Sequence, residues 1–247
     1  MKKKTTIKEQ IVIYAKNNYY FNKTELKDYF YDKNIKFKNS TIKQYLFSLK
    51  KEKIIYGAGA GWYTIINKSF ELDTEPIKGT VTLLKSEFTF LNFSCWSTEQ
   101  IKGFYHHLPT LFILFIYAEK DVLGILKNFL EEKEFNVYLN PHKKEVEKFV
   151  TFRNRTVILR PLVTPRKYIP SFFSNIEKLL VDLAIEMEKL NLMDSSEYGH
   201  IISNIIFNYR INIAELLDYS ERRNIKEKMC SYISQGNIYS LPIFCRI

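Results

Sequence analysis

Residues 38–66 read KNSTIKQYLFSLKKEKIIYGAGAGWYTII, and this stretch decides the fold. Its first half predicts a helix that begins at Asn39 or Ser40 as the capping residue. Two short extended runs follow, joined by GAGAG, and glycine supplies the positive φ that a tight hairpin turn needs. A helix followed directly by a small hairpin is typical of the second half of a winged helix-turn-helix. An ordinary helix and hairpin of a protein core fit the same pattern. The apolar residues that share one helical face are Ile42, Tyr45, Leu46 and Leu49.

Two further helices are predicted before this stretch, as a winged helix-turn-helix requires. Residues 6–18 place apolar side chains on one helical face, and Asn22 with Glu25 has the spacing of a capping box that opens the next helix. Three helices and a wing within residues 1–70 predict a winged helix-turn-helix domain.

The outward face of the third helix carries hydrogen-bonding groups and cations. In a helix-turn-helix, the recognition helix enters the major groove of DNA with its N-terminal residues against base edges. An alternative is a winged helix used for protein contacts, with a solvated lysine face. The residues placed for base contacts are Ser40, Thr41, Lys43 and Gln44, with Phe47 placed for a thymine methyl or a neighbouring helix. Those placed for phosphate contacts are Lys50, Lys51, Lys53 and the Lys2–Lys4 tail.

The net charge of the 247-residue chain is +10, and its position matters more than its size. Residues 1–70 contain 15 lysines, no arginine and 5 acidic residues, whereas residues 71–247 contain 22 basic and 22 acidic residues. The whole excess therefore lies on the predicted winged helix. A lysine-rich composition of the kind that AT-rich genomes produce would not confine the excess to one end. This asymmetry favours a polyanionic partner such as DNA.

Cysteine usage and hydropathy indicate a soluble protein in a reducing compartment. Cys95, Cys230 and Cys245 are odd in number and form no CxxC pair, which argues against a zinc ribbon or a disulfide framework. The longest apolar run, residues 111–118, is far shorter than the roughly 20 residues of a membrane span. We therefore expect a cytoplasmic protein without a membrane partner.

The pattern changes beyond the hairpin. Residues 71–79 are polar and predict a linker, and residues 80–247 predict a second domain with an α/β part at 80–165 and a helical part at 166–247. The fold class is therefore mixed α+β. Strands are expected at 80–84, 88–93, 111–118, 137–139, 149–152 and 156–163, with helices at 97–106 and 120–132.

Helix-capping signals recur along the helical part. Ser174, Asp194 and Asn212 each stand three residues before a glutamate, which is the spacing of a helix-opening capping box. A final helix is expected at 226–233.

Aromatic and basic side chains stand together near two of these helix ends. They either form a partner interface, since Tyr and Arg are favoured in interface hot spots, or brace their own domain. The residues are Tyr209, Arg210, Arg222 and Arg223.

The residues predict no catalytic group, metal site or cofactor. Neighbours on a helix point about 100° apart, so His106 and His107 make a poor joint ligand set. His142 and His200 have no spaced partner, and all four histidines are interpreted as surface or interface residues. Glu119-Lys120-Asp121 after a buried strand invites comparison with nuclease cores, but the spacing does not fit. No P-loop, GxGxxG, GxSxG or HExxH motif occurs.

Several segments, in this order, resemble the AbiEi-type antitoxins of type IV toxin–antitoxin and abortive-infection systems. The two most specific are IEKLLVD at 176–182 and LLDYSERR at 216–223. The recognition helix and wing are lysine-rich where arginine is common in that family, so no operator sequence is carried over. The other segments are GAGAGWYTI at 57–65, CWST at 95–98, the acid-lysine pair at 119–120, RPLV at 160–163 and NYRIN at 208–212.

The resemblance implies a winged-helix DNA-binding domain joined to a C-terminal antitoxin domain. It implies a repressor that binds inverted repeats in double-stranded DNA upstream of its own operon. It also implies that the protein counteracts a nucleotidyltransferase toxin without needing a stable complex with it. The residues themselves favour only the DNA-binding half. The alternative hypothesis is a nuclease or other nucleic-acid enzyme, built on residues 80–247 and targeted by the winged helix.

Overall fold

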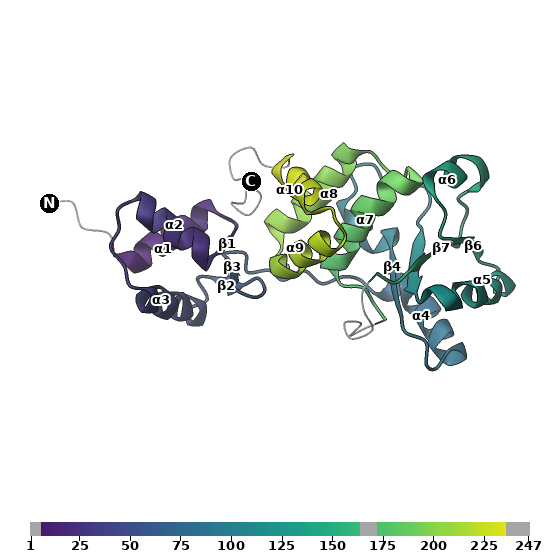
Figure 1. Ribbon diagram of the computed structural model, residues 1–247, viewed down its shortest axis with the longest axis horizontal. Helices are drawn as coiled ribbons and strands as arrows, with labels where there is room; N and C mark the ends of the chain where they lie inside the picture. Colours follow the sequence, from purple (N-terminus) through teal and green to yellow (C-terminus); the bar gives the residue numbers. More distant parts are fainter. Residues whose placement is uncertain (1–5, 164–171, 236–247) are drawn as a thin grey trace. The chain divides into compact units, whose positions relative to one another are not determined.

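The computed structural model describes residues 6–163 and 172–235 and has the expected mixed α+β fold (Figure 1). The chain forms two compact units. The first joins the described residues of 1–70 to those of 199–247, and the second spans Glu71–Tyr198. The C-terminal helices are therefore divided from the α/β part, whereas the sequence predicts one domain over 80–247.

The first unit begins with a winged helix. Its strands form a small antiparallel sheet of order β1-β3-β2, in which Tyr20 pairs with Thr64 and Tyr56 pairs with the same residue from the other side. The three predicted helices and the hairpin are confirmed, and β1 is a strand that the sequence did not reveal. The elements are α1 (Ile7–Asn17), β1 (Tyr20–Asn22), α2 (Lys23–Asp32), α3 (Asn39–Lys51), β2 (Tyr56–Gly57) and β3 (Trp62–Thr64).

Capping and apolar packing explain these helices. The side chain of Asn22 accepts hydrogen bonds from the backbone at Thr24 and Glu25, and Glu25 reaches back to the Asn22 N–H, as the capping box predicts. Apolar faces of all three helices then meet in one core that excludes water. Its members include Ile11, Phe21, Leu26, Phe30, Ile42, Leu46 and Leu49.

Three helices follow near the C-terminus: α8 (Ser195–Asn208), α9 (Ile213–Arg222) and α10 (Lys226–Gln235). The predicted caps at Asp194 and Asn212 are confirmed, since their side chains accept from the backbone N–H of Glu197 and Glu215. The predicted cap at Ser174 is wrong, because the neighbouring Asn175 caps the start of α7 (Ile176–Leu190).

The second unit is built on a four-stranded sheet of order β4-β5-β7-β6. The edge strand β4 is antiparallel to β5, and the other pairs are parallel, as their crossover helices require. The strands are β4 (Phe93–Ser97), β5 (Leu114–Ala118), β6 (Asn136–Leu139) and β7 (Thr156–Pro161), and the short helices are η1 (Thr98–Phe104), η2 (Lys120–Val122) and α6 (Lys143–Phe149).

Helices cover both faces of this sheet (Figure 1). On one face, α4 (Glu75–Glu87) and α5 (Leu123–Glu132) pack on side chains such as Cys95, Ile116 and Leu159. On the other face lies α7 (Ile176–Leu190), which contributes Glu186 to a contact with Arg160 of β7. Strand residues alternate between the two covered faces, so most residues of β4, β5 and β7 are buried, whereas in the edge strand β6 only Val137 is.

A buried ion pair joins β7 to α7. Arg160 and Glu186 are 3% and 0% exposed, and the Arg160 Nε donates to both carboxylate oxygens of Glu186 at 3.0 and 3.1 Å. Its Nη2 also donates to Glu186, and its Nη1 donates to the Asn140 side chain and to the Pro141 carbonyl. One arginine thus holds the sheet, the helix and the segment after β6 together.

Two predictions for the start of the second unit were wrong. The predicted linker 71–79 ends in helix, because α4 begins at Glu75, with proline in its first turn where no N–H is needed. The predicted strand 80–84 is also part of α4. There Ile77, Val81 and Leu84 recur at helical spacing and face the core, and this longer period overrides the local β-branched residues.

Two further strands were misplaced. Of the predicted strand 88–93, only Phe93 is in β4, because the residues before it form the turn out of α4. The predicted strand 149–152 does not form, since α6 runs to Phe149, whose side chain is 74% exposed. Within the described residues, no helix is long and apolar enough to cross a membrane.

Candidate nucleic-acid interface

The outward face of α3 presents the residues expected to contact DNA. Ile42, Leu46 and Leu49 anchor the opposite side of the helix in the core. Because those three fix its rotation, the polar face must point to solvent, and Phe47 is left 72% exposed. Thr41 is half-buried, and the other expected contact residues are exposed: Ser40, Lys43, Gln44, Phe47, Lys50, Lys51 and Lys53.

The start of α3 differs from the prediction. Its N-cap is Lys38, without a side-chain hydrogen bond, so the predicted cap at Asn39 or Ser40 was wrong. Both residues already lie in the first turn, which contains no acidic side chain. The positive end of the helix dipole is therefore not neutralised by a local carboxylate, and this favours an anion near the N-terminus of α3.

A second group of lysines belongs to the same surface. Lys23 and Lys27 of α2 are half-buried, and Lys23 lies close enough to both Lys27 and Lys43 of α3 for their charges to repel. The pKa of Lys23 is lowered, first by partial loss of hydration and then by the positive charges of Lys43 and Lys27. Cations gathered against their own repulsion form a positive surface that an anion would relieve.

Sequence reasoning missed Lys23 and Lys27. Their spacing of four residues shows that they share a face of α2, but it does not show that this face lies beside the start of α3. The helix-turn-helix geometry itself was the available signal, since in it the helix before the recognition helix crosses the DNA backbone. The Lys2–Lys4 tail, also expected to contact phosphates, lies outside the described residues.

The end of α3 is held by a small polar cluster. Lys8 of α1 forms an ion pair with Glu52 at 2.6 Å, and the Ser48 hydroxyl donates to the same carboxylate. These contacts lower the pKa of Glu52, the Lys8 hydrogen bond contributing most and the Ser48 hydrogen bond next. The chain then reverses at Lys53, which has a φ of 58°, and enters the hairpin. The cluster fixes α1 against the C-terminal end of α3.

The tip of the wing is covered by another part of the chain. Ala58 is 1% exposed, and its carbonyl accepts from the backbone N–H of Ala214 in α9. Gly59 has a φ of +104°, and a Cβ there would lie 2.1 Å from Asn212 Oδ1 and 2.6 Å from Ala214 Cβ. Only glycine fits this position, on both conformation and space. In contrast, a Cβ at Gly61 would meet open space.

A backbone connection reinforces this contact. The Arg210 N–H donates to the Lys68 carbonyl at 2.7 Å, and the Phe70 N–H donates to the Arg210 carbonyl at 3.0 Å. The Tyr20 hydroxyl donates to the Tyr209 carbonyl at 2.8 Å. The segment between α8 and α9 therefore pairs with the chain that leaves the wing, and it belongs to the same unit as the winged helix.

The four aromatic and basic residues near these helix ends make contacts within the chain. Tyr209 lies under the Lys68 ammonium at 4.4 Å, and Arg210 stacks over Tyr56 at 4.9 Å. Of the two alternatives, interface or brace, the bracing contacts are present. For the second pair, Arg222 bonds to Asp218 at 2.9 Å and Arg223 donates to the Tyr219 hydroxyl at 2.9 Å.

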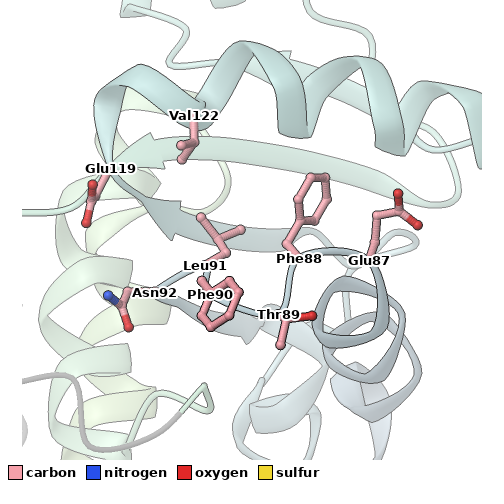
Figure 2. Close-up of a pocket in the computed structure, with 8 residues that line it drawn as sticks. All are labelled: Glu87, Phe88, Thr89, Phe90, Leu91, Asn92, Glu119 and Val122. Carbon is pink, nitrogen blue, oxygen red and sulfur yellow. The ribbon is translucent and has the colours of Figure 1, made fainter.

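A shallow pocket in the second unit bears on the nuclease alternative. It lies between the loop from α4 to β4 and the residues after β5 (Figure 2). Glu87 and Glu119 are its two carboxylates, and Figure 2 shows them at opposite ends of the row of lining residues. Phe90, on the same loop, is 95% exposed. Two separated carboxylates do not form the paired ligands that a divalent metal needs for phosphodiester hydrolysis.

These observations define a mixed α+β protein with a lysine-rich winged helix whose wing is supported by C-terminal helices. Residues 41–239 match the model of a family of unknown function, DUF6577. The chain belongs to this family. A comparison with curated proteins finds no match.

Proposed function

We propose that the protein binds double-stranded DNA through its winged helix and represses its own promoter, as the antitoxin of a type IV toxin–antitoxin system. The observation that carries the DNA-binding half is the exposed face of α3. Lys43 and Gln44 project from its first half, and Lys50 and Lys51 project from its last turn. Base-reading groups near the N-terminus of a recognition helix, with cations beyond them, suit the major groove.

The charge distribution supports the same proposal. The +10 excess of residues 1–70 lies on one part of the chain, and the Lys23–Lys27–Lys43 group lies beside the start of α3. Phosphate neutralisation releases counterions and supplies most of the non-specific affinity for DNA. A chain with this role would act in the cytoplasm.

Binding of the full chain to its own upstream region tests the proposal. Fluorescence anisotropy should show tighter binding to that duplex than to a scrambled duplex of equal length. If about six phosphates are neutralised, the logarithm of the affinity should fall with the logarithm of salt concentration with a slope of roughly −5. Equal affinity for the two duplexes at all salt concentrations would remove the repressor role.

Substitutions separate base reading from phosphate contact. Gln44→Ala and Lys43→Ala should reduce discrimination between the two duplexes by about 1–3 kcal/mol. Lys50→Ala and Lys51→Ala should weaken binding to both duplexes alike and make the salt slope shallower by about 1 unit each. Lys144→Ala, which removes an exposed lysine from α6 of the second unit, is the matched control and should change neither quantity.

The antitoxin half rests on the resemblance to AbiEi-type proteins. Its test is co-expression with a nucleotidyltransferase encoded beside this gene, with growth as the readout. The chain should restore growth that the toxin arrests. A Lys43→Ala/Gln44→Ala variant should still restore it, because neutralisation is assigned to a part of the chain other than the DNA surface. Failure of the wild-type chain to restore growth would contradict the antitoxin role and leave the DNA-binding result standing.

A further inference from the structure

Two histidines and a buried carboxylate meet in the second unit, away from the winged helix. His106 and His107 follow η1, which ends at Phe104, so the pair lies in a bend and not on a helix. The expectation that adjacent histidines point apart therefore does not apply to them. Glu197 comes from the first turn of α8, far away in sequence.

The two imidazole rings are turned toward each other. His106 Nδ1 lies 3.0 Å from His107 Nε2, and the ring planes are 89° apart. Two nitrogens bound to a tetrahedral zinc ion at about 2.0–2.1 Å lie roughly 3.3 Å apart, so a small ring rotation would accept the ion. Without an ion, one ring must give its N–H to the lone pair of the other. A metal would replace that shared proton.

The carboxylate is fixed beside this pair by the backbone of the same two residues. Glu197 is 7% exposed, and its Oε1 accepts from the N–H of His106 at 2.6 Å and from the N–H of His107 at 3.3 Å. One ligand atom from each of the three residues lies within 4.8 Å of the others. Across the described part of the chain, this is the one group of three or more His, Cys, Asp or Glu side chains with that spacing.

We propose that His106, His107 and Glu197 form a binding site for a divalent transition metal, with zinc the best match. Two imidazoles and one carboxylate are a donor set that zinc takes, and it leaves a fourth position open. Both histidines are exposed, so that position faces solvent and holds water or an oxygen ligand. Magnesium and calcium, which prefer oxygen ligands, fit the set poorly.

Metal binding to the full chain tests this proposal. Competition with a chromophoric chelator should show one zinc ion bound per chain at neutral pH. His106→Ala and His107→Ala should each weaken zinc affinity by about 100-fold or more, since loss even of a group that only orients a ligand costs about 10–100-fold. His142→Ala, at the N-cap of α6 and outside the group, is the matched control and should bind zinc like the wild type.

A conservative variant separates ligation from folding. Glu197→Gln keeps an oxygen that can accept from both backbone N–H groups but removes the anionic ligand, so the fold should persist while zinc affinity falls. Circular dichroism checks the fold of each variant. Cobalt supplies a second readout, because a site made of nitrogen and oxygen ligands gives a cobalt spectrum without a thiolate charge-transfer band. The proposal is overturned if the wild type binds no zinc, if the His106→Ala/His107→Ala variant binds it equally well, or if the thiolate band appears.

Discussion

The winged helix has exposed lysines on α3, whereas the sheet unit contains a buried ion pair. On α3, Lys43, Lys50 and Lys51 are exposed and make no ion pair with any described residue. In the sheet unit, Arg160 and Glu186 are both buried and bonded to each other. An exposed cation is hydrated and remains available to a ligand, whereas a buried ion cannot lose its partner without a large cost. These exposed lysines of α3 are therefore available to a ligand, whereas the buried pair of the second unit holds elements together.

Separation of the buried pair should give the largest effect. Arg160→Met leaves Glu186 buried without its cation and should lower the free energy of unfolding by about 3–5 kcal/mol, measured by urea denaturation. The Arg160→Met/Glu186→Leu variant should recover most of the loss, because an apolar pair needs no compensation. A single variant as stable as the wild type would contradict the role given to this pair.

The next largest effect is expected at the wing. Gly59→Ala should lower the free energy of unfolding by about 2–3 kcal/mol, because strain at positive φ adds to a clash with the Asn212 side chain. Gly61→Ala, also at positive φ but facing open space, should cost only about 1 kcal/mol. The difference between the two measures the contact between the wing and α9. Equal losses would mean that this contact contributes nothing.

Removal of the α2 lysines should affect binding and spare the fold. If the proposed DNA surface includes them, Lys23→Met and Lys27→Met should each make the salt slope of DNA binding shallower by about 1 unit. Stability should be unchanged or slightly higher, because each substitution removes a repulsion that involves Lys23. A loss of stability with an unchanged salt slope would mean that these lysines stabilise the fold and do not bind DNA, which would contradict the contrast with the buried pair.

The smallest effect concerns Glu52. Its pKa is lowered in the folded chain, so its contribution to stability is present above the ordinary glutamate pKa of about 4.3 and disappears as the pH falls through the lower folded value. Wild type should therefore exceed Glu52→Gln in unfolding free energy at neutral pH, with the gap closing in acid. Asp28→Asn, at an exposed carboxylate of α2, is the matched control. A gap that does not change with pH would argue against the ion pair with Lys8.

The elements that were predicted correctly depend on short-range chemistry. Each acts within one or two turns, so it can be predicted without knowledge of the tertiary structure. Examples are the Asn22 capping box, the Asp194 and Asn212 caps and the periodicity of α3. The elements that were missed depend on distant partners. Strand β1 exists because Tyr20, Phe21 and Asn22 pair with β3, which follows only after α2, α3 and β2 in the chain. The β-branched residues of α4 predicted a strand, but the segment forms a helix that buries Ile77 against the sheet.

The candidate sites follow the same division. The outward residues of α3 were predictable, because helical periodicity alone separates its two faces. The neighbourhood of Lys43 was not, since it requires the packing of α2 on α3. The His106–His107 group was dismissed on the assumption of a continuous helix, and its third member comes from another element altogether. Nothing in the local spacing of His106 points to Glu197.

The glycine at position 59 has a consequence for how the chain is made. The wing leaves the ribosome long before the residues that cover its tip, Asn212 and Ala214, which come much later in the chain. A chain interrupted between them carries the core of the winged helix with its hairpin tip bare. The finished surface around the wing is therefore a property of chains translated past α9, and early termination products differ from them at the wing itself.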